Sequence, residues 1–291
     1  MFLYNKGLKK YLLLFALGFI SAQGFAQSHF FMTGFIGAAN YRGDLGKSAL
    51  TPGNTRPVGG IGMLFQLNHR MLIRTEMNFG KVSGSDKYDA ATRSRNLSFT
   101  SKITEVALLF EYVLFDLYEY KVSPYVFAGV STFKFSPYTK DRNGNIVFLA
   151  EQSTEGQGFY KDRKDYKLNE IAFPLGGGLQ WAISPNKRLG VEIGLRKTTT
   201  DYLDDVSTTY INPAVLAQNR GGTAVSLAYR GGELPNALPY PADGAKRGNP
   251  NNNDWYIFTG LSFRISLQPK PRKLEYKFKP RTARTSCPKI F

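Results

Sequence analysis

The sequence predicts an all-β protein, an eight-stranded antiparallel transmembrane β-barrel with long extracellular loops and a basic periplasmic C-terminal tail. Three observations predict this fold. Segments whose apolar and polar residues alternate with a period of two recur along the chain, as they do in barrel strands. The connections between these segments alternate between short and long. No apolar run of about 18 residues follows the amino-terminal region, so any membrane span must consist of strands.

The segment 255–267 shows the alternation most clearly. One face is almost wholly apolar, and the other carries Arg264 together with serine, glycine and aromatic residues. Its length exceeds the roughly 9–11 residues that a tilted barrel strand needs to cross the hydrocarbon layer. A strand of a soluble sandwich has the same period, so the choice between the two folds depends on the rest of the chain.

Seven further segments repeat the pattern, at residues 29–39, 60–67, 71–79, 97–114, 125–135, 170–181 and 188–198. Short turns lie near Asn68, at 116–123 and at 184–187, whereas polar loops occupy 41–56, 82–96, 137–167 and 201–253. Outer-membrane barrels have short periplasmic turns and long external loops, while a soluble sandwich has no reason to alternate in this way. We expect loop 201–253 to be flexible or ordered by a partner, and Asn143-Gly144 to form a tight hairpin turn.

The amino terminus has the features of an export signal. Lysines precede the apolar run 11–20, which is too short for a membrane span, and Gly24 and Ala26 are small residues suited to a signal peptidase. We therefore expect a signal peptide at 1–26, an outer-membrane β-barrel at 27–268 and a basic periplasmic tail at 269–291. An even number of strands returns the chain to its starting side, so both termini are expected in the periplasm of a Gram-negative bacterium.

Charged residues also occupy the polar faces of the predicted strands. Those expected to face the barrel interior are Arg74, Glu76, Glu105, Glu111, Glu170, Glu192, Arg196 and Arg264. An eight-stranded barrel is narrow enough for side chains to fill it, and buried charges must pair because an uncompensated one costs several kcal/mol. The mixed signs therefore predict a salt-bridged plug rather than a conducting pore.

The histidines and carboxylates form no recognisable active site. His29 begins the first strand and His69 lies in a periplasmic turn, on the wrong side for lipid A or an external peptide. Asp204 and Asp205 are adjacent but have no nearby histidine, and we expect them at a solvated loop edge. Histidine and cysteine are too few for a zinc site. The sequence thus predicts no enzyme activity, cofactor or metal, and its charge of +16 does not indicate nucleic acid binding in an exported protein.

The tail beyond Gln268 is strongly basic and contains Cys287, the single cysteine of the chain. Its apolar and charged residues alternate, which suits addition of a strand to the edge of a partner's sheet. The residues expected to bind a partner are Arg272, Lys273, Tyr276, Lys277, Phe278, Lys279, Arg281, Arg284 and Cys287. A lone thiol in an oxidising compartment has no internal partner, so our hypothesis is an intermolecular disulfide. The alternative is a basic arm that rests on acidic lipid headgroups.

Several short motifs resemble a known family. They are the start Gln27-Ser28, the motif Asn-Tyr-Arg-Gly-Asp-Leu at 40–45, the aromatic stretch 110–125, Gly-Leu-Ser-Phe at 260–263 and Cys-Pro-Lys at 287–289. Together they resemble the PorG-like outer-membrane barrels of Bacteroidetes. The resemblance implies a non-enzymatic component of the type IX secretion machinery that associates with a periplasmic ring of the PorK lipoprotein and PorN. The alternative is a stand-alone barrel with a surface role, such as adhesion or lipid A modification, which the long loop 201–253 favours.

Overall fold

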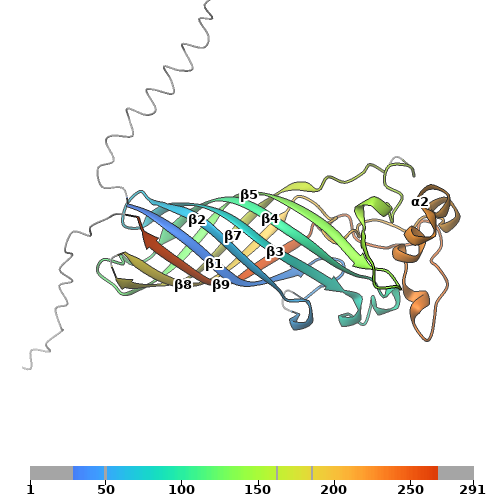
Figure 1. Cartoon of the computed structure of the whole chain (residues 1–291), viewed down its shortest axis with the longest axis horizontal. Coiled ribbons are helices and arrows are strands. Elements are labelled where there is room, and N and C mark those ends of the chain that lie inside the picture. The colour runs from blue at the N-terminus through green and yellow to red at the C-terminus, as the bar shows by residue number, and fades with distance from the viewer. Residues whose placement is uncertain (1–28, 49–50, 162, 185, 268–291) are drawn as a thin grey trace, which may run out of the picture.

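The computed structural model describes residues 29–48, 51–161, 163–184 and 186–267, and these residues form a closed antiparallel barrel (Figure 1). The barrel strands are β1 (His29–Arg42), β2 (Arg56–Gln66), β3 (Met71–Ser85), β4 (Ser98–Val113), β5 (Val122–Lys140), β7 (Asn169–Ser184), β8 (Lys187–Thr198) and β9 (Trp255–Ser266). Each pairs with its neighbours in sequence, and β1 pairs with β9, so the barrel has no open edge. The predicted signal peptide and tail lie outside the described residues.

The remaining elements all lie in the long connections at one end of the barrel, which we call the long-loop end (Figure 1). They are η2 (Pro52–Asn54), η3 (Asp86–Tyr88), η4 (Arg93–Arg95), β6 (Ile146–Phe148), η5 (Ala150–Gln152), α2 (Pro213–Ala228) and η6 (Gly231–Glu233). The opposite, short-turn end holds the start of β1 and the end of β9, where Phe31 pairs with Ser266. Among the described residues, no helix combines the length and the apolar character needed to cross a membrane.

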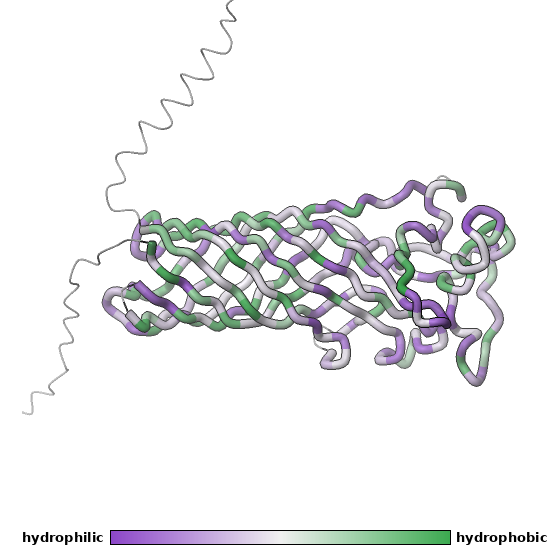
Figure 2. Tube along the Cα trace, in the orientation of Figure 1, coloured by the Kyte–Doolittle hydropathy of each residue, from purple (hydrophilic) through white to green (hydrophobic). Residues whose placement is uncertain are grey.

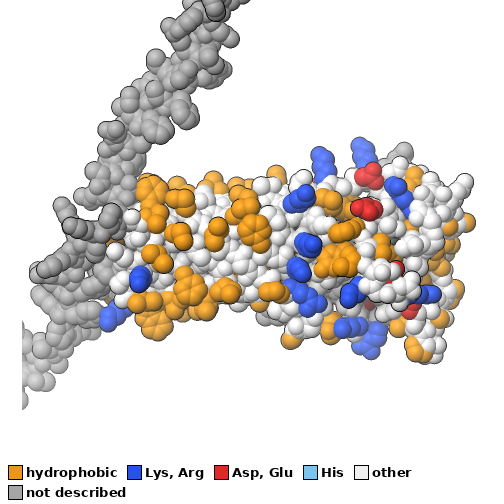
Figure 3. All heavy atoms as spheres, viewed as in Figure 1, with side chains coloured by type: hydrophobic (Ala, Val, Ile, Leu, Met, Phe, Trp, Pro, Cys, Tyr) orange, Lys and Arg blue, Asp and Glu red, His pale blue; other side chains and the backbone are white. Residues whose placement is uncertain are grey.

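The outward faces of the barrel strands form an apolar belt. On β8, Val191 and Ile193 are 55% and 48% exposed, whereas Glu192 between them is buried. Figure 2 shows the same alternation of hydrophobic and hydrophilic residues along the strands, and Figure 3 shows apolar side chains on the barrel wall. Other exposed members of the belt are Met32, Ile36, Ile61, Met63, Met77, Phe79, Val106, Leu108, Phe110, Val126, Val130, Phe173, Leu175, Leu179, Trp181, Leu195, Leu261, Phe263 and Ile265. A water-soluble protein would not expose so large a continuous apolar surface.

The barrel closes along a seam in which glycines face each other. Gly37 of β1 pairs with Gly260 of β9. A Cβ atom added to Gly37 would lie 2.2 Å from the carbonyl oxygen of Thr259, and one added to Gly260 would lie 2.3 Å from that of Ile36. Larger residues at either position would push the first and last strands apart, so these glycines permit the close contact that closes the sheet.

The predicted fold class is confirmed. All eight predicted segments are strands of the barrel, although β3 and β5 extend further into the long-loop end than the sequence pattern indicated. The turn at Asn143-Gly144 is also confirmed, since the Asp141 N–H donates to the carbonyl oxygen of Asn145 (2.9 Å) and β5 pairs with β6 beyond it. The short strand β6 was not predicted.

The expectation that loop 201–253 is flexible or ordered by a partner is wrong. Asn212 caps α2 by accepting a hydrogen bond from the Ala214 N–H (2.9 Å), and Pro213 occupies the first turn, where its missing N–H is tolerated. Ile211, Leu216, Ala224 and Ala228 then form a small core. The loop therefore folds on apolar contacts of its own.

The two faces of β8 and β9 should respond differently to substitution. Ile193→Arg places a charge on the belt and should destabilise the folded barrel by roughly 2–4 kcal/mol near the bilayer midplane. Ser262→Ala, at a buried interior position, should cost less. Heat-modifiable gel mobility and unfolding in urea from lipid vesicles measure both effects. Equal tolerance of the two substitutions would contradict the assignment of the faces.

Candidate functional site

The barrel interior holds a network of ion pairs that begins with Arg74 of β3. Its guanidinium lies 2.8 Å from Glu192 of β8 and 3.2 Å from Glu76, and it stacks over the ring of Phe127 at 4.8 Å. Glu192 also accepts a hydrogen bond from the Tyr125 hydroxyl. Because these strands lie on different sides of the barrel, the contacts join opposite walls across the interior.

A second pair lies toward the short-turn end, where Arg264 of β9 donates from Nη1 and Nη2 to the two carboxylate oxygens of Glu111 on β4. Arg264 also donates to the side-chain oxygen of Gln180 (3.2 Å) and stacks over Tyr125. Glu111 lies 3.6 Å from Arg74, so this pair is continuous with the first. A two-point contact between guanidinium and carboxylate fixes the geometry of both groups.

A third group closes the network toward the long-loop end. The carboxylate of Glu105 lies 3.4 Å from Arg196 and accepts hydrogen bonds from Asn78 (3.0 Å) and the Tyr256 hydroxyl. Arg196 itself lies over the ring of Phe258 at 4.1 Å. Each charge is thus matched by an opposite charge and by polar or aromatic neighbours, as burial requires.

Seven of the eight interior charges expected from the sequence come together in this network. Glu170 does not join it, because it lies near the long-loop end of β7, is partly exposed and accepts a hydrogen bond from Thr199 (2.8 Å). Arg188, which the alternation of residues 188–198 also places inward, is buried in the interior and donates to Gln66 (3.4 Å). Its inward position on β8 follows from the same alternation that identified Glu192 and Arg196.

The interior is sealed at the level of these charges. Each charged side chain of the network is at most 6% exposed, and a water-filled channel running past them would leave them accessible. With Arg188 included, the barrel strands bury four arginines and four glutamates, so the interior charge sums to zero. Such a plug leaves no water-filled path past these charges and carries no net charge.

Removing one partner of an interior pair should strongly destabilise the barrel. Glu111→Leu leaves Arg264 without its two-point partner and should cost about 3–5 kcal/mol, because the guanidinium stays buried and uncompensated. The double variant Glu111→Leu/Arg264→Met removes both charges and should recover part of that loss. Urea unfolding from lipid vesicles measures the free energies. A double variant no more stable than the single one would argue against this pairing.

The four long connections form a second polar structure, which we call the loop cap and define as the described residues within 43–55, 86–97, 141–168 and 199–254. At its centre, Arg247 donates to Glu155 (2.9 Å) and to the carbonyl oxygen of Asp205 (2.6 Å). Glu155 also accepts from the N–H groups of Ser207 (2.9 Å) and Thr208 (3.0 Å). These contacts tie connection 141–168 to connection 199–254.

The expectation that Asp204 and Asp205 lie at a solvated loop edge is wrong, because both are fully buried. Asp205 accepts hydrogen bonds from the hydroxyls of Thr154 and Tyr166. Asp204 accepts from the Tyr41 hydroxyl and from the N–H groups of Leu45 (3.2 Å) and Val206 (2.9 Å). All of these donors except the Val206 N–H come from distant parts of the chain, and together they supply the hydrogen bonds that a solvated carboxylate would take from water.

The Asn-Tyr-Arg-Gly-Asp-Leu motif at 40–45 holds the loop cap to the barrel. The hydroxyl of Tyr41 bridges Asp204 and Asp254, the last residue before β9. Asp44 accepts a hydrogen bond from the Asn249 N–H (2.8 Å), and the Leu45 side chain is buried. A Cβ on Gly43 would lie 1.9 Å from an oxygen of Asp254, so this position requires glycine. The motif therefore has a structural role at the first loop.

Burial makes two aspartates of the loop cap unusually weak acids. Burial raises the pKa of Asp204 to about 8, with repulsion from Asp44 adding to the effect. Burial also raises the pKa of Asp201 to about 8, and the neighbouring charge of Asp204 contributes to that rise. Between about pH 4 and pH 8, these two aspartates are therefore protonated in the folded state and ionised in the unfolded chain.

This linkage predicts that the loop cap loses stability as pH rises. Below about pH 4 both folded and unfolded aspartates are protonated, and between about pH 4 and pH 8 only the folded ones are, so each increment of pH favours unfolding. Limited proteolysis of loop 199–254 should be slower at pH 5 than at pH 8.5, after correction for protease activity on an unfolded peptide. Asp204→Asn should reduce the difference. Equal or slower cleavage at pH 8.5 would contradict the prediction.

Both histidines lie at the short-turn end, away from the buried carboxylates of the loop cap. His29 begins β1, and the Nδ1 atom of His69 lies 2.7 Å from Asp116, with its ring against Tyr118. Within the described part of the chain, no group of three or more histidine, cysteine, aspartate and glutamate side chains has a metal-binding arrangement. The residues expected to bind a partner, from Arg272 to Cys287, lie outside the described residues.

A closed eight-stranded barrel with an apolar belt outside and compensated charges inside defines a transmembrane β-barrel of the outer-membrane type. The chain belongs to the family described as "Domain of unknown function (DUF6089)", whose profile matches residues 9–217. No curated protein matches the sequence significantly.

Solved structures similar to this chain are themselves bacterial surface or outer-membrane proteins. Neisserial surface protein A is 12% identical, with a TM-score of 0.41 over 81% of this chain and 96% of its own. Ail, the attachment invasion locus protein of Yersinia pestis, is 10% identical, with a TM-score of 0.40 over 82% and 98%. A major outer membrane protein from Thermus thermophilus is 13% identical, with a TM-score of 0.38 over 81% and 99%.

Proposed function

We propose that this protein is a non-enzymatic outer-membrane component of the type IX secretion machinery. In this proposal the long-loop end faces the outside, the short-turn end faces the periplasm, and the barrel links the outer membrane to a periplasmic ring of a PorK-like lipoprotein and a PorN-like protein. The sequence motifs that resemble PorG-like barrels support the assignment, among them the motif at 40–45.

The observation that carries the proposal is the sealed interior. The pairs Arg74–Glu192 and Arg264–Glu111 span the barrel and are buried, so solute transport would require the network to come apart. A barrel that neither conducts nor gathers catalytic groups in its interior acts through its surfaces. A role as a membrane anchor for other proteins fits these properties.

The attachment surface in this proposal is the periplasmic tail. β9 ends at Ser266, at the short-turn end and beside the start of β1, which in this proposal is the periplasmic side. The basic residues of the tail suit an acidic surface on a ring lipoprotein, and the alternation of apolar and charged residues suits strand addition. The ring would thus be held beneath the outer membrane by charge and by backbone hydrogen bonds.

Deletion of the gene tests the proposed function. We expect loss of cargo secretion with unchanged lipid A, restored by the full chain but not by a chain ending at residue 268. Heat-modifiable mobility of the truncated chain would show that the barrel still folds. Normal secretion in the deletion strain would reject a role in this machinery.

The disulfide hypothesis makes a separate prediction about Cys287. Non-reducing gels of envelope extracts should show a band shifted by the mass of a partner, lost with reductant and lost in Cys287→Ser, since this is the single thiol of the chain. Wild type running only as a monomer would refute the disulfide. Co-purification of ring proteins that persists without the tail would refute docking through it.

A stand-alone surface role is the second candidate, and the ordered loop cap favours it. The cap buries its own core and its own ion pairs, so it presents a fixed shape rather than mobile loops. Such a surface suits adhesion better than lipid A modification, because both histidines lie at the opposite end. Normal secretion together with loss of surface attachment in the deletion strain would favour this candidate.

A further inference from the structure

The outward face of β3, β4 and β5 changes abruptly where the apolar belt ends. Met77 pairs with Val106, and four residues further toward the long-loop end Lys81 pairs directly with Lys102. On β5, Lys134 pairs with Thr104, which makes it a diagonal neighbour of Lys102. We call Lys81, Lys102 and Lys134 the lysine cluster; all three are exposed. Figure 3 shows Lys and Arg side chains between the apolar belt and the loop cap.

No carboxylate on these strands compensates the lysine cluster. The acidic residues of β3 and β4 are Glu76, Glu105 and Glu111, and all three are buried in the interior network, while β5 contains none. Among the described residues, none of the three lysines has an ion-pair partner. Like charges directly opposite on neighbouring strands repel each other, so an external anion would relieve an unfavourable arrangement.

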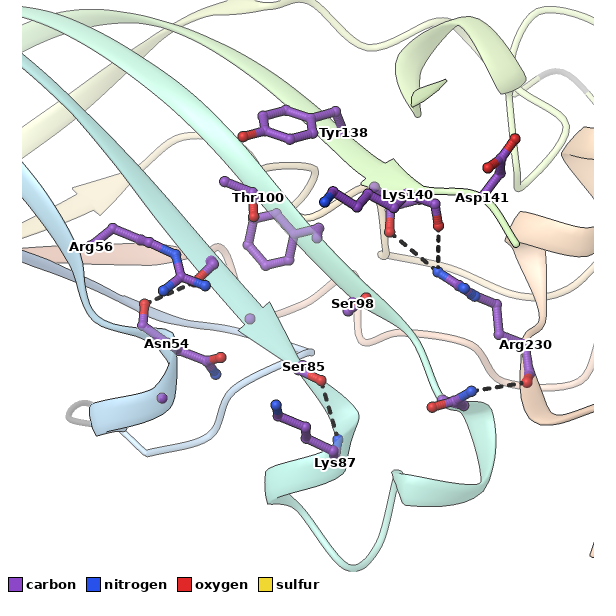
Figure 4. Close-up of a pocket in the computed structure, with 16 residues that line it drawn as sticks. Asn54, Arg56, Ser85, Lys87, Ser98, Thr100, Tyr138, Lys140, Asp141 and Arg230 are labelled. Carbon is purple, nitrogen blue, oxygen red and sulfur yellow. Dashed lines mark hydrogen bonds between the residues drawn. The ribbon is translucent and has the colours of Figure 1, made fainter. Parts of the chain in front are cut away.

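A polar cavity of about 520 Å³ opens directly beyond the lysine cluster, and we call it the rim pocket. Thr100 of β4 pairs with Tyr138 of β5, and both residues line this pocket. Thr100 is the next outward-facing residue of β4 after Lys102 in the direction of the long-loop end. Arg56, Lys87 and Lys140 lie around Ser98 and Thr100, each from a different element (Figure 4). The hydroxyl of Ser85 and the amides of Asn54 and Asn96 also line the pocket, together with the ring of Phe99.

The rim pocket keeps an excess of positive charge. Arg230 is engaged with Glu233 (3.0 Å) and with the carbonyl oxygen of Lys140 (2.9 Å). The carboxylate of Asp141 accepts from the N–H groups of Asn143 (2.9 Å) and Asn145 (2.8 Å) and from the Asn145 side chain (3.1 Å). In the described part of the structure, Arg56 and Lys140 form no ion pair, and Lys87 contacts the ring of Tyr88.

We propose that this face, from the apolar belt through the lysine cluster to the rim pocket, binds the headgroup of a phosphorylated glycolipid of the surrounding membrane. Acyl chains lie along Val106, Leu108 and Val130 of the belt. Phosphate groups contact the lysine cluster, where cations meet the end of the hydrocarbon layer. The sugar hydroxyls enter the rim pocket, whose neutral polar side chains donate and accept hydrogen bonds.

The continuity of the surface identifies a lipid rather than a soluble anion as the ligand. The outward residues of β4 run from Leu108 and Val106 through Thr104 and Lys102 to Thr100, so the apolar, cationic and hydroxyl-bearing positions follow one another on a single strand. A free phosphate uses only the cationic positions. A phosphorylated glycolipid supplies partners for all three, because its acyl chains lie in the hydrocarbon layer and its phosphates and sugar hydroxyls lie together just beyond it.

The test measures lipid retention by the full chain in dodecyl maltoside, using native mass spectrometry with diphosphoryl lipid A, dephosphorylated lipid A and inorganic phosphate as probes. Wild type should retain diphosphoryl lipid A at least tenfold better than the dephosphorylated lipid. Lys81→Gln/Lys102→Gln/Lys134→Gln should weaken retention about 100-fold at low salt, because each near-surface charge contributes about 1 kcal/mol and 1.4 kcal/mol is a factor of ten.

Three further variants make the result specific. The triple Lys→Arg variant at the same positions keeps the charge and should bind like wild type. Lys164→Gln/Arg220→Gln/Lys246→Gln removes the same charge from exposed positions of the loop cap and should leave retention unchanged. Arg56→Gln/Lys140→Gln should weaken retention about tenfold through the rim pocket, and it tests the proposal even if the triple Gln variant fails to fold. Heat-modifiable mobility reports folding of each.

Several outcomes would overturn the proposal. One is that the folded triple Gln variant retains diphosphoryl lipid A as well as the wild type does. Another is that the wild type binds phosphorylated and dephosphorylated lipid equally. Binding of inorganic phosphate that lipid A does not compete with would identify a soluble anion as the ligand instead. Because secretion is not measured, these outcomes are independent of the proposed part in type IX secretion.

Discussion

The structure depends on the requirement that every backbone N–H and C=O group inside a membrane has a hydrogen-bond partner within the protein. A sheet meets this requirement only if it closes, and here β1 pairs with β9 along a seam where Gly37 and Gly260 let the backbones approach. Closure with eight strands makes the interior narrow. The narrow interior in turn lets inward-facing charges pair across it, as Arg74 and Glu192 do.

The loop cap must also supply hydrogen-bond partners to buried polar groups, and it does so without a regular sheet. Its buried carboxylates are removed from water, so each needs donors from the protein. Glu155 obtains them from backbone N–H groups and Arg247, and Asp204 obtains them from Tyr41 and the first loop. Burial also makes the cap sensitive to pH, because it raises the pKa values of Asp201 and Asp204 to about 8.

The distribution of charge separates the regions of the molecule by role. On β3 and β4 all carboxylates face inward and pair with arginines, whereas the lysines of the same strands face outward and have no ion-pair partner among the described residues. The interior charges pair with one another and seal the barrel. On the outer surface, the proposed role of Lys81 and Lys102 is to bind lipid phosphates. The proposed secretion role uses a third region, the basic tail, which is suited to a protein partner on the short-turn side.

Much of the barrel was predictable because side chains in a strand alternate between two faces, and a membrane makes one face apolar. That period identified eight strands and the inward position of Glu105, Glu111 and Arg264 before any contact was known. It did not identify the pairs. Arg74 and Glu192 are 118 residues apart, and only barrel closure brings β3 and β8 to facing walls.

The errors have the same origin. Asp204 and Asp205 lie in a stretch rich in polar residues, where local composition predicts exposure. Their burial depends on Tyr41 of β1 and on Leu45 and Tyr166 of other loops. Glu170 has the inward alternation of its strand, but its position near the long-loop end leaves it partly solvated. The sequence by itself determined which face each strand residue occupies, because that is a local property of an extended backbone. The tertiary structure decided which charges meet and which loops are buried, because both depend on distances between residues far apart in the chain.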